Sequence, residues 1–211
     1  MAVPLLGFLF PAVCPVCRVA GSFEGDGSGL PCPECRRSLA ASPLGSGPVP
    51  PGLDWVCSAF RHEGVPRKAL NAFKFDRRTA LAAPLASLLA VRLRGLPVSG
   101  YLVAVPQSTL GGRFRGFDPA AELALELESL VDRLRFRPGL LKRTGSGRQR
   151  GRGRRARLDG ADRFEVRELL DGPVVLVDDV LTTGATLSAC AAVLRRTDAG
   201  PIGAVTLTRR A

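Results

Sequence analysis

The residues best suited to chemistry lie near the C-terminal end of the chain. Asp178 and Asp179 directly follow the apolar run from Val174 to Val177, and a loop rich in threonine and glycine comes next. Backbone N–H groups and hydroxyls of such a loop, at the start of a helix, suit a phosphate. Adjacent carboxylates can accept hydrogen bonds from a vicinal diol, or hold a divalent cation through water. Together the two groups predict a site for a ribose 5-phosphate.

The elements that must position this site follow from the local pattern. We interpret the apolar run as a buried parallel strand and Leu187 to Arg196 as the helix after the loop. The alternative is an ordinary strand, turn and helix with solvated acids, but the order of strand, acid pair, loop and helix favours the phosphate site. The residues expected around the phosphate are Thr182, Thr183, Gly184, Ala185 and Thr186.

The rest of the chain alternates strand and helix patterns, which predicts an α/β fold with a parallel sheet. Further strands are expected over residues 55–61, 101–106 and 202–207, and helices over 66–75, over 79–94 with Pro84 as a kink or break, and from Asp118 to about Leu134. Ligands of parallel sheets bind beyond the C-terminal strand ends. Pro106 and Gln107 should therefore lie close to the acid pair.

Four cysteines form two pairs with metal-ligand spacing. Cys14 and Cys17 make one C-x2-C pair, and Cys32 and Cys35 make the other, with 14 residues between the pairs. Four thiolates complete a closed tetrahedral shell, so we predict a structural and not a catalytic Zn²⁺. Two disulfides or a metal-free redox pair are the alternatives. Cys57 and Cys190 fall outside this spacing and are expected to be packed core thiols.

The composition predicts a small module joined to a larger domain. Residues 1–42 contain the paired cysteines, residues 43–52 form a linker rich in proline and glycine, and residues 53–211 contain the strand and helix patterns. No apolar run approaches the roughly 20 residues that a membrane span needs. The apolar segment before Cys14 lacks a basic start, so we interpret it as folded structure and expect a cytoplasmic protein.

Positive charge is concentrated in one segment of the sequence. The formal net charge is +11, and residues 142–157 contain eight basic residues and no acid. These residues are Lys142, Arg143, Arg148, Arg150, Arg152, Arg154, Arg155 and Arg157. Such a density attracts a phosphodiester backbone through counterion release, and it predicts contact with a polyanion such as single-stranded DNA. A solvated loop made arginine-rich by overall composition is the alternative.

Several segments carry a family resemblance. Residues 174–186 resemble the motif with which type I phosphoribosyltransferases bind phosphoribosyl pyrophosphate (PRPP). The cysteine pairs, the Ala72-Phe73-Lys74-Phe75 helix, the Val105-Pro106 loop and the Arg113–Phe117 segment add, in order, a resemblance to the ComF family of competence proteins. The resemblance implies a phosphoribosyltransferase-like domain that binds PRPP with Mg²⁺.

The resemblance also implies roles for individual residues. Asp178 and Asp179 would be the catalytic acids that hold the ribose hydroxyls, and the threonine loop would hold the 5-phosphate. The residues expected to contact pyrophosphate are Pro106, Gln107, Arg113 and Arg115. The chain departs from the family where Asp118-Pro119 replaces an Asn-Gln pair, and where a Gly/Arg run occupies residues 145–157.

Two functional hypotheses remain open at this stage. The first is a ComF-like protein of natural transformation that binds single-stranded DNA and PRPP in the cytoplasm, with other DNA-uptake proteins as partners. The alternative is an active phosphoribosyltransferase that transfers phosphoribosyl from PRPP to an unidentified acceptor and releases pyrophosphate. Only 25 residues follow the PRPP-like motif, which leaves no C-terminal hood to cover a nucleobase. Whether the protein is an enzyme therefore depends on whether it has an acceptor substrate.

Overall fold

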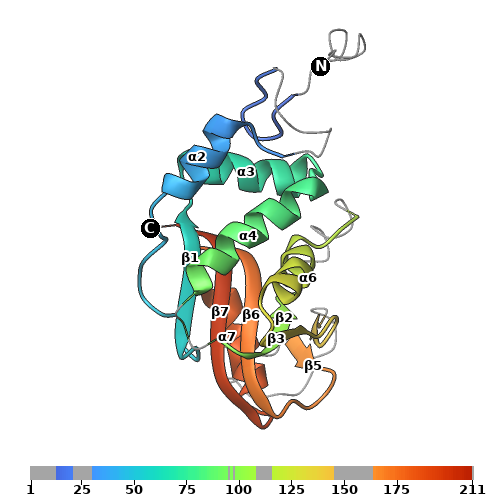
Figure 1. Ribbon diagram of the computed structural model, residues 1–211. Helices are drawn as coiled ribbons and strands as arrows, with labels where there is room; N and C mark the ends of the chain where they lie inside the picture. Colours follow the sequence, from blue (N-terminus) through green and yellow to red (C-terminus); the bar gives the residue numbers. More distant parts are fainter. Residues whose placement is uncertain are drawn as a thin grey trace.

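A five-stranded parallel sheet forms the centre of the molecule (Figure 1). The computed structural model describes residues 13–20, 30–94, 96, 98–107, 116–144 and 164–210. The strand order is β1-β7-β6-β2-β3, and each neighbouring pair runs parallel. The strands are β1 (Trp55–Arg61), β2 (Gly100–Ala104), β3 (Leu134–Phe136), β6 (Gly172–Leu181) and β7 (Ala199–Arg209). The predicted α/β class with a parallel sheet is confirmed.

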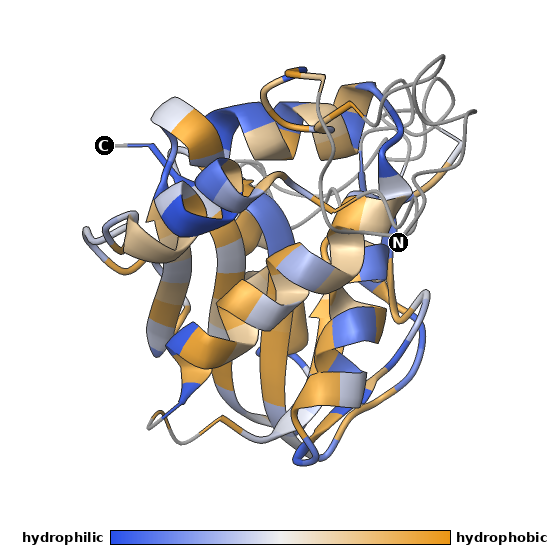
Figure 2. Ribbon diagram, turned by 45° about the horizontal axis from the view of Figure 1, so that its top comes forward, coloured by the Kyte–Doolittle hydropathy of each residue, from blue (hydrophilic) through white to orange (hydrophobic). Residues whose placement is uncertain are grey.

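Helices cover both faces of this sheet, as expected for a parallel sheet whose strands are apolar on both sides. On one face pack α3 (Gly64–Phe75), α4 (Ala82–Leu93) and α6 (Pro119–Leu130); on the other lies α7 (Ala185–Leu194). Figure 2 shows the strands of the sheet coloured mainly as hydrophobic beneath helices with mixed faces. Two buried clusters, one on each face, form the core.

A short antiparallel ribbon lies on the α7 face. Its strands are β4 (Leu141–Arg143) and β5 (Phe164–Val166), and the buried Phe164 joins the cluster formed by α7. The sequence analysis did not anticipate either strand, because three residues are too few to show an alternating pattern. Of the predicted basic residues, Arg148, Arg150, Arg152, Arg154, Arg155 and Arg157 lie outside the described residues, as do Arg113 and Arg115.

The start of α6 agrees with its prediction, but its end does not. The Asp118 carboxylate accepts hydrogen bonds from the N–H groups of Ala120 and Ala121, at 3.0 and 3.3 Å, and so caps the helix. The helix ends at Leu130, and Leu134, predicted to be helical, begins β3 instead. The helical spacing of the leucines extends to Leu134, but pairing with β2 makes this segment a strand.

Smaller differences concern the other helices. The predicted break near Pro84 takes the form of a 3₁₀ turn, η1 (Thr79–Leu81), followed by α4, with Pro84 in the first turn of α4, where it is tolerated. α7 begins two residues before the predicted Leu187 and ends at Leu194 instead of Arg196. Cys190 is fully buried, as predicted, whereas Cys57 is partly buried.

The cysteine segment packs on the main domain. Helix α2 (Pro33–Ala41) begins within the second cysteine pair, with Cys32 as its N-cap and Cys35 in its first turn, and lies beside α3 (Figure 1). Cys14, Cys35 and Leu39 belong to the same buried cluster as Phe73 of α3. The segment 43–52 then runs to β1, and its Gly45 forms a bridge to Ser58. Within the described residues, no helix combines the length and apolar character that crossing a bilayer demands.

Candidate functional site

The acid pair lies where strand β6 extends beyond its neighbour β2. β2 ends at Ala104, which pairs with Val177, whereas β6 continues to Leu181 along β7. The sequence analysis placed Asp178 and Asp179 after the strand, but both belong to it, because pairing with β7 keeps the backbone extended. The acids therefore project at the C-terminal edge of the sheet, beside the space left by the shorter strand.

Asp178 is partly buried, and the pKa of its carboxyl is raised. Burial raises its pKa, and the neighbouring Asp179 raises it further, to about 8, against the lowering effects of the Asp179 N–H and of Lys74. The Asp179 N–H donates to the Asp178 carboxylate at 2.8 Å. At neutral pH Asp178 is therefore largely protonated, and a protonated carboxyl both donates to and accepts from a sugar hydroxyl.

Asp179 is held by a lysine that the sequence analysis named only as part of a motif. The Lys74 Nζ lies 2.7 Å from an Asp179 carboxylate oxygen, and the two side chains are only 13% and 9% exposed. Lys74 comes from the Ala72–Phe75 segment of α3, so the ion pair connects this helix to the acid strand. Two bare carboxylates would repel a phosphorylated ligand. The ion pair and the raised pKa of Asp178 remove most of that repulsion.

The threonine loop lies at the N-terminus of α7. Thr182, Thr183 and Thr186 are exposed, and Gly184 is buried with a φ of +77°. A side chain at Gly184 would place its Cβ 2.7 Å from the Pro50 ring, so only glycine fits here in both conformation and space. The segment 43–52 thus packs against the loop. Exposed hydroxyls at the start of a ten-residue helix form a site suited to a phosphate.

The loop after β2 reaches the same edge of the sheet. The Val105 N–H donates to the Val177 carbonyl at 2.9 Å, so Pro106 and Gln107 follow directly beside the acid strand. The Gln107 side chain donates to the Phe117 carbonyl at 3.3 Å, which fixes it toward the start of α6. The structure therefore brings together the acid pair, the threonine loop and this loop, as the sequence predicted from the strand ends.

His62 is a further residue of this edge that the sequence analysis did not assign to the site. It follows β1, and its Nδ1 lies 2.9 Å from the hydroxyl of Thr208 at the end of β7. Burial lowers the pKa of His62, and the charges of Arg210, Arg67 and Lys74 lower it further. An uncharged imidazole is thus placed on the same edge as Asp179. A lone histidine at a strand end carried no motif that could have identified it.

The four predicted metal ligands form one cluster. The Sγ atoms of Cys14, Cys17, Cys32 and Cys35 all lie within 4.8 Å of one another, so they can share one metal ion. Backbone N–H groups of Val16, Cys17 and Cys32 donate to the Cys14 sulfur at 3.3–3.5 Å. Burial alone would raise the pKa of the Cys14 thiol, but these donors bring it down to about 6, whereas burial raises the pKa of Cys35. The cluster therefore suits a thiolate-binding metal.

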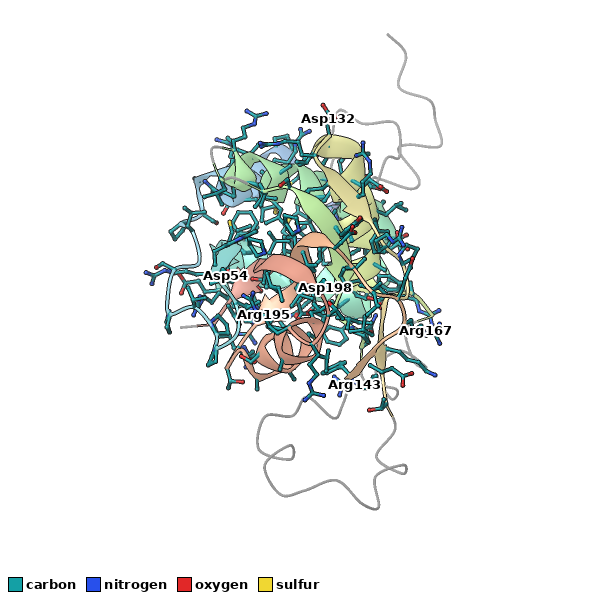
Figure 3. All side chains as sticks on the ribbon, turned by 90° about the horizontal axis from the view of Figure 1, so that it is seen from below. Asp54, Asp132, Arg143, Arg167, Arg195 and Asp198 are labelled. Atoms are coloured by element: carbon teal, nitrogen blue, oxygen red, sulfur yellow. The ribbon has the colours of Figure 1, made fainter. Side chains whose placement is uncertain are left out.

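The described part of the basic segment lies on the ribbon beside α7. Lys142 lies 3.7 Å from Glu165 in an exposed pair, and the guanidinium of Arg143 stacks 4.9 Å from the centre of the Phe164 ring. Figure 3 shows Arg143 at the periphery, away from Asp54 and Arg195, which pair at the opposite, N-terminal edge of the sheet.

If the four cysteines hold a metal ion, its removal should destabilise the whole domain, because the cysteine segment shares its core with α3. We expect one zinc ion per chain by inductively coupled plasma mass spectrometry, and a Cys35→Ser variant with less than half of it. A loss of about 3 kcal/mol corresponds to a fall in Tm of roughly 6–12 °C for a domain of this size. Cys57→Ser, outside the cluster, is the control. Undiminished zinc in Cys35→Ser would contradict the assignment.

Ionisation of Asp178 should lower the stability of the ligand-free protein at high pH. Since the pKa of Asp178 is raised to about 8, the folded state holds its proton more tightly than the unfolded chain does. That stabilising contribution is complete below about pH 4 and is lost as the pH rises through 8. Asp178→Asn, which keeps an acceptor for the Asp179 N–H, should therefore melt several degrees above the wild type at pH 9, with a smaller difference at pH 5.

The control for this measurement is Asp198→Asn, an exposed acid at the opposite edge of the sheet. Its effect on Tm should not change with pH. A difference between Asp178→Asn and the wild type that stays constant from pH 5 to pH 9 would show that ionisation of Asp178 does not limit stability.

Comparison with known proteins shows a similarity that extends along most of the chain. The chain is 27% identical over 200 residues to the DNA utilization protein YhgH of Salmonella typhi. The match covers 90% of this chain and 81% of that relative, so it is not confined to a single motif. No family model matches the chain.

Proposed function

We propose that this protein is a ComF-like protein of natural transformation, which binds PRPP and single-stranded DNA in the cytoplasm. The observation that carries the proposal is the C-terminal edge of the sheet, where a charge-compensated acid pair lies beside an exposed threonine loop at a helix start. The similarity to a relative named for DNA utilization supports the same role. Other DNA-uptake proteins are the expected partners.

The roles of the site residues follow from their chemistry. The Asp178 and Asp179 carboxyls would hold the two ribose hydroxyls, and the threonine loop with the N-terminus of α7 would hold the 5-phosphate. Pro106 and Gln107 lie where the pyrophosphate would extend, and Arg113 and Arg115 are proposed to neutralise it. Magnesium bound with PRPP would supply positive charge at the pyrophosphate. Zinc held by the four cysteines would have only a structural role.

The alternative, an active phosphoribosyltransferase, is favoured by one observation in the structure. His62 stands on the same edge as Asp179 and is kept uncharged by its surroundings. An uncharged imidazole can take a proton from an acceptor as that acceptor attacks C1 of the ribose. Release of pyrophosphate only when an acceptor is present, and its loss in Asp178→Asn, would support turnover.

Calorimetric titration with PRPP and Mg²⁺ tests the ligand site. We expect saturable binding by the wild type, and at least tenfold weaker binding by Asp178→Ala and by Gly184→Val, because the first variant lacks the carboxyl that holds the ribose hydroxyl, and the side chain of the second would strike the Pro50 ring and displace the threonine loop. Asp198→Asn should bind as the wild type does. Equal affinities for all four proteins would rule out this edge as the PRPP site.

Single-strand binding measured against salt concentration tests the basic segment. Charge reversal of Arg148, Arg150, Arg152 and Arg154 to glutamate should weaken binding, and it should reduce the slope of log K against log salt by about 0.7 for each phosphate that the variant no longer neutralises. An unchanged slope would remove residues 145–157 from the DNA-binding surface.

A further inference from the structure

The C-terminal end of α3 connects the parts of the molecule to which the proposed function assigns ligands. The Phe73 ring contacts the Phe117 ring edge to face, at 5.6 Å between ring centres, just before α6 begins. The next residue, Lys74, forms the buried ion pair with Asp179. These two contacts fix the backbone at the end of the helix, and so they fix the direction of the residues that follow.

The residues after Phe75 reach two other parts of the chain. Asp76 pairs with Arg18, which follows the first cysteine pair. Arg77 adopts a left-handed conformation, with a φ of +54°, and its guanidinium lies close to Gly116. The end of α3 thus lies between the cysteine segment on one side and the loop that leads into α6 on the other.

Phe75 lies in the middle of this junction and is largely exposed. The residue is 63% exposed, and it is the one aromatic among the exposed large hydrophobic residues of the described chain. Its own neighbour Lys74 places a charged nitrogen 5.9 Å from the ring centre. A single exposed apolar residue needs no explanation by itself. What distinguishes Phe75 is the surface around it.

That surface is positively charged. Arg18, Arg77 and Arg78 are all exposed next to Phe75 in sequence or through the Asp76 pair. Helix α2, which lies beside α3, adds two exposed arginines, Arg36 and Arg37. Of the two acids in this group, Asp76 is paired with Arg18, and Glu34 lies in the first turn of α2. An exposed aromatic ring among arginines offers a base a stacking surface and offers the adjoining phosphates cations.

We propose that Phe75, Arg18, Arg77 and Arg78, here called the α3 platform, form a contact surface for single-stranded DNA. One base stacks on the Phe75 ring, and the arginines bind the phosphates on either side. This inference rests on the proposed single-strand binding and assigns it residues other than 142–157. A duplex does not fit the proposal, because its bases are already stacked on one another and cannot lie on the ring.

The platform leads directly to the proposed phosphoribosyl site. Phe75 follows Lys74, and the Lys74 ammonium contacts Asp179. A strand that lies across the platform therefore passes between the cysteine segment and the acid pair.

The test uses two 20-nucleotide strands, one of thymidines and one with the same backbone but abasic. We expect Phe75→Ala to bind the thymidine strand roughly tenfold more weakly than the wild type, and the abasic strand with less than a twofold change, because only the former can stack. Phe75→Trp should restore binding. Leu169→Ala, which removes a 76% exposed apolar side chain elsewhere, is the matched control and should change neither affinity.

Arg77→Gly tests the charged part of the platform at a position whose backbone conformation suits glycine. Glycine adopts a φ of +54° more easily than arginine does, which offsets the loss of the Arg77 side-chain contacts, so the variant should melt within a few degrees of the wild type. Its binding to the thymidine strand should weaken, and the salt slope should fall by about 0.7. Arg196→Ala, an exposed arginine just after α7, should leave the slope unchanged.

The outcomes separate this inference from the proposed function. Failure of the wild type to bind either strand overturns the proposed single-strand binding itself. Wild-type binding with unchanged affinity in Phe75→Ala and an unchanged slope in Arg77→Gly overturns the platform alone. An equal loss on both strands overturns base stacking on Phe75. Zinc content and Tm of each variant show that the fold is intact.

Discussion

The ion pair between Lys74 and Asp179 is the interaction on which the rest of the site depends. Both charges are almost completely removed from water, so each needs the other, and removal of one partner from such a pair typically costs about 3–5 kcal/mol. The pair joins α3 to the acid strand. Since α3 also packs against the cysteine segment, the position of that segment is linked to the position of the acids.

The second constraint is the unequal length of neighbouring strands. β6 continues along β7 for four residues after β2 has ended, and this difference leaves the acid pair at an open edge with its backbone still fixed. The arrangement has a cost, because partial burial beside Asp179 raises the pKa of Asp178. A carboxyl that is held in an unfavourable setting without a ligand is typical of a binding site, where a bound hydroxyl satisfies it.

Features determined by local chemistry were predictable from the sequence. The cysteine spacing predicted a four-thiol cluster, Asp118-Pro119 predicted a capped helix start, and the strand, acid and threonine order predicted the components of the site. Each of these signals lies within a few residues, where conformation and hydrogen bonding are decided by near neighbours.

Features that depend on distant partners were not predictable. Lys74 and Asp179 are about 100 residues apart in sequence, and nothing local to either residue shows that they meet. The extension of β6 to Leu181 depends on β7, and the change of Leu134 from helix to strand depends on β2.

If the acid pair binds a ribose diol while the threonine loop holds a 5-phosphate, the protein must distinguish sugars that differ in one hydroxyl. The most direct measurement is calorimetric titration of the wild-type protein with ribose 5-phosphate and with 2-deoxyribose 5-phosphate, which differ only in the hydroxyl at C2. We expect measurable binding of ribose 5-phosphate and at least tenfold weaker binding of the deoxy sugar, because one carboxyl is left without its partner. Equal affinity for the two sugars would contradict the assignment of the acid pair.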